Sequence, residues 1–147
     1  MRQQVILDTG PLVAFLNRRY KYHDWSIGQW REIVPPMLTC EAVLSEACFL
    51  LRRQAKGVRH ILELLRRKAI HVQFRLTENV APLIDLMQKF EGIPMSLADA
   101  CLVRMAEMLD ESSIFTLDHD FTAYRKNKRQ VIPLLIPPVA LRHRVKE

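Results

Sequence analysis

Apolar residues follow two patterns along the chain, short continuous runs and longer stretches with helical spacing. The short runs predict β-strands over residues 5–7, 37–39, 69–74, 113–116 and 131–135. The longer stretches predict helices over residues 11–17, 23–33, 41–53, 58–68, 77–90 and 96–109. Alternating strands and helices indicate an α/β fold, a three-layer α/β/α sandwich with a mainly parallel central sheet.

Turn and capping residues separate these elements without dividing the chain into parts. Thr9 or Gly10 is expected to cap a helix whose first turn contains Pro11, and Pro35 and Pro36 end the helix over residues 23–33. No repeat or Gly/Ser-rich linker interrupts the 147 residues. We therefore expect a single domain over residues 1–147, with a core over about 5–135 and a basic C-terminal tail over 136–147.

Composition adds a modest indication about partners and location. With 22 Lys and Arg against 16 Asp and Glu, the net charge of +6 should attract anions, including phosphate backbones. Cys40, Cys48 and Cys101 are odd in number and lie in apolar runs, which is typical of buried, reduced thiols. The apolar run before Asp8 is too short for a signal peptide or membrane span, so we expect a soluble, cytoplasmic protein.

Four acidic residues stand at positions that favour a shared site. Asp8 and Asp118 each follow a predicted strand, and the carboxyl ends of neighbouring parallel strands meet at one edge of a sheet. Glu46 and Asp99 interrupt the apolar parts of two helices, at spacings that place them on core-side faces. A carboxylate in such a place is costly unless it is neutralised, hydrogen bonded or bound to metal.

Converging carboxylates indicate a site for hard divalent cations. Mg²⁺ or Mn²⁺ prefers carboxylate and water oxygens and would remove the repulsion among the acids. One ion, or a pair roughly 4 Å apart, can activate water and stabilise the leaving oxygen of a phosphodiester. Such a site hydrolyses phosphodiesters without a nucleophilic side chain.

Each acid also has a purely structural explanation. Asp8 could cap the helix that contains Pro11, and Ser96-x-x-Asp99 fits a capping box. Glu46 could pair with a buried Arg, and Asp120 could cap a short helix at Phe121. These explanations lose force only when Asp8, Glu46, Asp99 and Asp118 are taken together.

Four motifs resemble those of PIN-domain proteins, especially the VapC toxins of bacterial toxin–antitoxin pairs. They are the strings over residues 6–16, 38–46, 96–100 and 115–121, in the family's order. Matched position by position, Asp8, Glu46, Asp99 and Asp118 fall on the family's metal-binding acids. The resemblance covers about residues 5–135 and implies an α/β/α sandwich, Mg²⁺- or Mn²⁺-dependent endoribonuclease activity, dimerisation and inhibition by a small antitoxin.

Two neighbouring acids compete with members of this quartet. Glu41 lies about 140° around a helix from Glu46, so both cannot face one ion, and we favour Glu46. Asp120 is two residues from Asp118 and could serve as a fourth ligand in its place. Thr9 and Thr116 are candidate hydroxyl partners of the site.

Basic residues could form a collar that holds RNA phosphates around the acids. They are Arg18, Arg19, Lys21, Arg52, Arg53, Lys56, Arg59, Arg125, Lys126, Lys128 and Arg129. For most of them a solvated helix face or loop explains the charge better than direct RNA contact does. Trp25 and Trp30 fit a core or an oligomer interface better than a stacking platform, and His23 fits a helix start better than a ligand.

Three alternatives to a PIN-type nuclease differ from it in the residues that they require. A PIN-like protein with weak catalysis could act as an RNA-binding or regulatory partner outside a toxin–antitoxin pair. A haloacid-dehalogenase-like phosphatase would use Asp8 as nucleophile, but it needs a second Asp at the position of Gly10. A receiver-type signalling domain would need an acidic pair after the first strand, which is absent.

Overall fold

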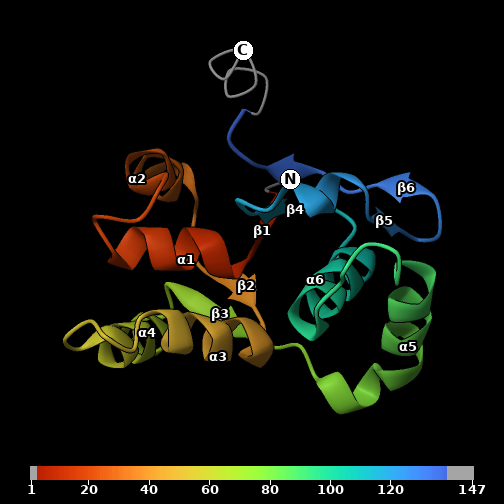
Figure 1. The fold of residues 1–147 in the computed structure, drawn as a ribbon, viewed down its shortest axis with the longest axis horizontal. Helices are drawn as coiled ribbons and strands as arrows, with labels where there is room; N and C mark the ends of the chain where they lie inside the picture. The colour runs from red at the N-terminus through yellow and green to blue at the C-terminus, as the bar shows by residue number, and fades with distance from the viewer. Residues whose placement is uncertain (1–2, 139–147) are drawn as a thin grey trace.

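A five-stranded parallel sheet forms the centre of the computed structural model, which describes residues 3–138 (Figure 1). Its strand order is β3-β2-β1-β4-β7, and all four neighbouring pairs run parallel. The strands are β1 (Gln4–Leu7), β2 (Met37–Thr39), β3 (Ile70–Val72), β4 (Ser112–Phe115) and β7 (Leu134–Leu135). The central place of β1 beside β4 brings the ends of these two strands together, as the sequence predicted.

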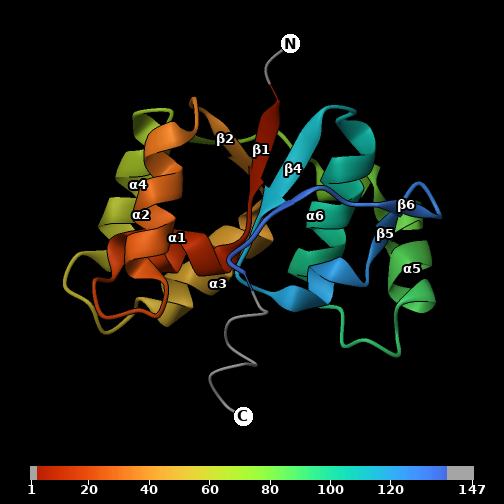
Figure 2. The ribbon, with the colours of Figure 1, turned by 90° about the horizontal axis from the view of Figure 1, so that it is seen from above.

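Helices cover both faces of this sheet. They are α1 (Thr9–Leu16), α2 (His23–Glu32), α3 (Glu41–Leu50), α4 (Gly57–Arg66), α5 (Val80–Lys89) and α6 (Leu97–Met108). Figure 2 shows α1, α2 and α4 on one side of the sheet, with α5 and α6 on the other. The predicted three-layer α/β/α sandwich is confirmed.

The core forms where the predicted apolar faces meet. Ile6 and Leu7 of β1 are fully buried, and α6 is buried on most of its circumference because it packs between the sheet and α5. Trp30 stacks on Phe15 with ring centroids 4.1 Å apart, and Trp25 meets Phe115 edge-on. The tryptophans therefore belong to the packing of the α1–α2 layer.

The helix predicted over residues 77–90 begins later than expected. Leu76–Glu78 form a separate 3₁₀ turn, η1, and α5 starts at Val80. A helix through residue 77 would require a backbone N–H at Pro82, whereas in α5 Pro82 occupies the first turn, where no such donor is needed. Between the two segments, Asn79 donates to the carbonyl of Arg75 at 2.8 Å and accepts from Arg104 at 2.9 Å.

The strand predicted over residues 131–135 is two strands separated by Pro133. β6 (Gln130–Val131) pairs antiparallel with β5 (Arg125–Lys126), which the sequence did not predict, and β7 joins the main sheet. Lys126 is buried, and its Nζ lies 3.4 Å from the carbonyl oxygen of Ala106. Its predicted place in a phosphate-binding collar is therefore wrong.

The cysteine prediction holds in part. Cys40 and Cys101 are buried and Cys48 is half-buried, and all three are free thiols. Of the helices within residues 3–138, none has the length and apolar character required to cross a bilayer. The predicted basic tail lies, from residue 139 onward, outside the described residues.

Candidate active site

Asp8 links the end of the central strand to the first helix. Its backbone N–H donates to the carbonyl of Phe115 at 3.0 Å, which continues the pairing of β1 with β4. Its side chain caps α1 by accepting from the backbone N–H of Thr9 at 2.7 Å. The expectation that Thr9 or Gly10 would be the cap is wrong, because the chain is already helical at Thr9.

The second oxygen of Asp8 is held from the neighbouring strand. The hydroxyl of Thr116, one residue past β4, donates to Oδ2 of Asp8 at 2.6 Å. Close approach of the two chain segments here depends on Gly10, where a Cβ would lie 3.1 Å from the Leu117 side chain. Asp8 is only 6% exposed, so its carboxyl group is the most buried of the predicted acids.

Asp99 has both of the roles considered for it. In a capping box at the start of α6, its N–H donates to the Ser96 hydroxyl at 3.0 Å and its Oδ2 accepts from the Ser96 N–H at 3.2 Å. The same Oδ2 accepts a hydrogen bond from the Tyr124 hydroxyl at 3.2 Å. The capping geometry thus orients a half-buried carboxylate toward Tyr124.

Glu46 is exposed, so its predicted core-side position on α3 is wrong. Val43 and Ala47 face the core, and the 100° step from Ala47 back to Glu46 turns that side chain out of the interior. The Glu46 carboxylate nevertheless accepts from the Thr9 hydroxyl at 2.7 Å. This bond draws it toward the start of α1, beside Asp8.

Asp118 is hydrogen bonded to residues on both sides of it in the chain. Asp118 caps the short 3₁₀ helix η2 (His119–Thr122) by accepting from the N–H of Asp120 at 2.9 Å. Its own N–H donates to the Thr116 hydroxyl at 2.9 Å. The cap was expected at Asp120, so that prediction is wrong.

The four acids line one pocket of about 250 Å³ beyond the carboxyl ends of β1 and β4. Its lining residues are Asp8, Thr9, Gly10, Tyr20, Glu46, Leu50, Asp99, Leu117 and Asp118. Asp120 is not among them, and Glu41 lines a different pocket beside Arg75. The position of the pocket is the usual one for ligands of open parallel sheets.

Burial and mutual repulsion make this pocket unfavourable for free carboxylates. The pKa of Asp8 is raised from 3.8 to about 7, mainly by burial and to a smaller extent by the charges of Asp99 and Asp118, against the opposing effect of the hydrogen bonds from Thr116 and Thr9. Burial also raises the pKa of Asp99, with a further contribution from Asp118. Within residues 3–138, none of the four acids forms an ion pair with Lys or Arg.

The donor set fits a hard divalent cation. Carboxylates and water are its preferred ligands, and Mg²⁺ keeps several waters while it is held by one or two carboxylates. In the part of the chain that the structure describes, no group of three or more Asp, Glu, His or Cys side chains is already arranged to hold a metal ion. Asp8 and Asp99 line the same pocket as Glu46 and Asp118, and a cation would offset the charge that raises the pKa of Asp8.

Two tyrosines of the site were not predicted from the sequence. Tyr124 is fully buried between Phe90 and Phe121, at ring distances of 5.4 and 5.2 Å. The spacing Phe121-x-x-Tyr124 after the fourth acid is the one sequence feature that could have indicated that Tyr124 packs beside the site. Tyr20 lines the pocket from the segment between α1 and α2, where no sequence pattern marks it.

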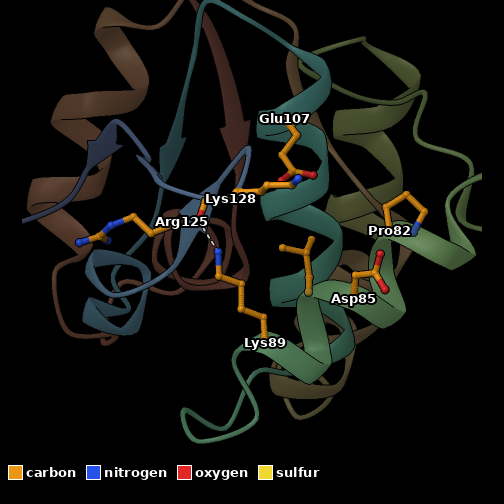
Figure 3. Close-up of a pocket in the computed structure, with 7 residues that line it drawn as sticks. Pro82, Asp85, Lys89, Glu107, Arg125 and Lys128 are labelled. Atoms are coloured by element: carbon orange, nitrogen blue, oxygen red, sulfur yellow. Dashed lines mark hydrogen bonds between the residues drawn. The ribbon is translucent and has the colours of Figure 1, made fainter.

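A second pocket lies on the opposite side of α6 from the main sheet (Figure 3). It is lined by Pro82, Asp85, Leu86, Lys89, Glu107, Arg125 and Lys128. The Lys89 ammonium group donates to the backbone carbonyl of Lys128, which connects α5 to the β5–β6 hairpin. The Arg125 guanidinium turns away and donates to the carbonyls of Thr122 and Tyr124.

Comparisons with known proteins agree with this geometry. The family model of the PIN domain matches residues 5–127. Among solved structures, the crystal structure of VapC20 from Mycobacterium tuberculosis, described as a toxin that cleaves the sarcin–ricin loop, is similar with a TM-score of 0.74. The two are 18% identical, over 82% of this chain and 94% of VapC20, so the likeness concerns the fold. No curated protein sequence matches the chain significantly.

Proposed function

The chain belongs to the PIN domain family, and on this basis we propose that it is a metal-dependent endoribonuclease, the toxin of a toxin–antitoxin pair. The observation that carries the proposal is the pocket that joins Asp8, Glu46, Asp99 and Asp118. In this proposal these four residues hold Mg²⁺ or Mn²⁺, with Asp120 outside the ligand set. The resemblance in fold to a toxin described as cleaving the sarcin–ricin loop supports RNA as the substrate.

The chain's own residues prepare the pocket for this reaction. Thr116 and Thr9 hold Asp8 and Glu46 through their hydroxyls, and Tyr124 holds Asp99. These bonds fix three carboxylates, which come from the residue after β1, from α3 and from α6, in the pocket where the proposal places the scissile phosphate. When bound, a divalent cation would supply an activated water and neutralise charge on the phosphate and its leaving oxygen.

The same proposal includes partners and location. We propose a homodimer acting in the cytoplasm, inhibited by a small antitoxin protein, as the resemblance to VapC toxins implies. A short reading frame beside the gene, whose product restores growth and copurifies with the chain, would support this pairing. If no product of a neighbouring reading frame binds the chain, the toxin–antitoxin part of the proposal is wrong and the nuclease part stands alone.

Substitutions of the acids, with a matched control on α3, test the catalytic part of the proposal. Asp8→Asn, Asp99→Asn and Glu46→Gln should each reduce Mn²⁺-dependent cleavage of RNA by 100-fold or more, on the order of the loss from removing a key electrostatic group. Glu41→Gln is the matched control, because Glu41 lies on α3 like Glu46 but outside the pocket.

Chelation completes this experiment. EDTA should abolish cleavage by the wild-type protein, and Mn²⁺ or Mg²⁺ should restore it. Full activity of Asp8→Asn or Asp99→Asn, or cleavage undiminished by EDTA, would overturn the metal mechanism. Unchanged circular dichroism of each variant would show that the fold is retained.

A further inference from the structure

Two large side chains without a carboxylate, Tyr20 and Leu50, are among the residues that line the acidic pocket. Tyr20 belongs to the segment between α1 and α2, and Leu50 is the last residue of α3. Both line the same pocket as Asp8 and Glu46, and both remain open to solvent, with exposed fractions of 36% and 45%. Phosphodiester hydrolysis requires carboxylates and water, so these two side chains are left without a role in the chemistry.

The backbone holds Tyr20 in place. Its N–H donates to the carbonyl of Asn17 at 3.0 Å, and its carbonyl accepts from the N–H of His23 at 3.1 Å. The His23 ring in turn lies 2.5 Å, through Nδ1, from the carbonyl of Ala14 in α1. A partly exposed aromatic ring on a hydrogen-bonded turn is preorganised for contact with a ligand.

We propose that Tyr20 and Leu50 form a subsite for an unpaired nucleobase next to the phosphate that the acids address, an inference that rests on the proposed RNA substrate. The base of a nucleotide lies one sugar away from its phosphate, and Tyr20 and Leu50 line the same pocket as the acids. A base stacks on an aromatic ring, and the apolar Leu50 side chain can cover part of its other surface.

The subsite determines which RNA the pocket accepts. A base within a duplex is stacked on its neighbours and cannot lie on Tyr20, so the nucleotide at the cut must be unpaired. Because every base has a flat aromatic face, stacking alone gives little preference among bases. Arg18 and Arg19 are exposed beside Tyr20 and are available to the phosphates of the adjoining strand.

Binding of short RNAs to Asp8→Asn protein tests the subsite directly. The probes are a fluorescein-labelled single-stranded 12-mer of adenosine, its duplex with the complement, and a 12-mer of abasic ribose phosphate, all in Mg²⁺ buffer. Adding Tyr20→Ala should weaken binding of the adenosine strand about tenfold, which equals about 1.4 kcal/mol and lies in the range for one stacked base. The abasic strand and the duplex should show no such loss.

Two matched variants separate the ring from other effects. Tyr20→Phe keeps the ring and should bind within about twofold of the parent. Phe49→Ala removes an exposed aromatic of α3 outside the pocket and should change nothing. Equal binding of the adenosine strand with and without Tyr20→Ala, or equal loss for the abasic strand, would overturn the subsite.

Cleavage kinetics distinguish failure of the subsite from failure of the proposed function. If wild-type protein cuts RNA and needs Asp99, Tyr20→Ala should raise KM about tenfold with little change in kcat, because stacking acts on bound substrate and transition state alike. Unchanged KM in an active enzyme would overturn the subsite alone. If wild-type protein cuts no RNA, the nuclease proposal fails, and the binding measurements still decide the subsite.

Discussion

The hydroxyl of Thr116 donates a 2.6 Å hydrogen bond to Oδ2 of Asp8, across 108 positions of sequence. Thr116 also accepts the backbone N–H of Asp118 at 2.9 Å. One hydroxyl group therefore connects two of the four acids at the ends of β1 and β4. This bond lowers the pKa of Asp8, against the larger effect of burial that raises it.

Thr116→Val removes that hydroxyl with little change of shape. The pKa of Asp8 should rise further, so the acidic limb of the pH profile for Mn²⁺-dependent cleavage should move to higher pH. Loss of a hydrogen bond to a buried charged group should also cost about 1–3 kcal/mol of unfolding free energy at pH 8. Thr116→Ser keeps the donor and is the control; an identical pH profile for Thr116→Val and Thr116→Ser would contradict this role.

Metal-free protein should lose stability as the pH rises. The pKa of Asp8 is about 7 in the folded chain against 3.8 for an unperturbed group, so the folded state binds the proton more tightly. The contribution of Asp8 is greatest below pH 4 and falls between pH 4 and 7, by roughly 4 kcal/mol at most. Urea unfolding in EDTA across this range measures it.

Asp8→Asn supplies the comparison for that measurement. The variant cannot ionise at this position, so its unfolding free energy should fall less than that of wild type between pH 4 and 7. Asp85→Asn changes an exposed acid of the second pocket and should leave the wild-type slope intact. Parallel curves for wild type and Asp8→Asn would show that Asp8 does not carry the raised pKa.

Tyr124→Phe tests how Asp99 is held. Removing the hydroxyl deletes its 3.2 Å bond to Oδ2 and keeps the packing against Phe90 and Phe121. Affinity for Mn²⁺, measured by calorimetry, should fall about tenfold, as is usual for a partner that orients a ligand. Tyr124→Leu adds a packing defect, so a fall that occurs only in Tyr124→Leu would assign Tyr124 to packing alone.

The sequence predicted most of the fold because its apolar runs and helical stripes are long enough to identify each main element. The sequence did not predict the β5–β6 hairpin, because strands of only two residues are too short to show a periodic pattern of apolar residues. It also placed the start of α5 too early, although Pro82 already restricts where that helix can begin.

The sequence predicted where some of the candidate site residues lie in the fold, and the errors in their placement have local causes. Asp8 and Asp99 stand where motif and spacing placed them, whereas the face occupied by Glu46 depends on how α3 is rotated against its neighbours, which its own sequence does not fix. The position of Tyr124 depends on its contact with Asp99, which is 25 positions away in the sequence. The position of Tyr20 depends on a hydrogen-bonded turn that no sequence pattern marks. Such contacts become visible only in three dimensions.

Lys89 and Lys128 at the second pocket are candidates for phosphate contacts on the α5 side of the molecule (Figure 3). Lys89→Gln and Lys128→Gln should each reduce the slope of log K against log salt for single-stranded RNA by about 0.7, the value for one phosphate contact. Arg66→Gln is the control, because Arg66 lies on α4 and pairs with Glu63. A slope that stays at the wild-type value in both variants would show that neither lysine contacts an RNA phosphate.

The position of a bound metal tests the central claim most directly. Crystals soaked in Mn²⁺, at a concentration that supports RNA cleavage, should give an anomalous difference peak in the acidic pocket. We expect it about 2.0–2.3 Å from carboxylate oxygens of Asp8 and of at least one of Asp99, Asp118 and Glu46, as for a hard ion with oxygen ligands. A peak confined to other parts of the protein, or an empty pocket at that concentration, would contradict the assignment of the four acids to a metal centre.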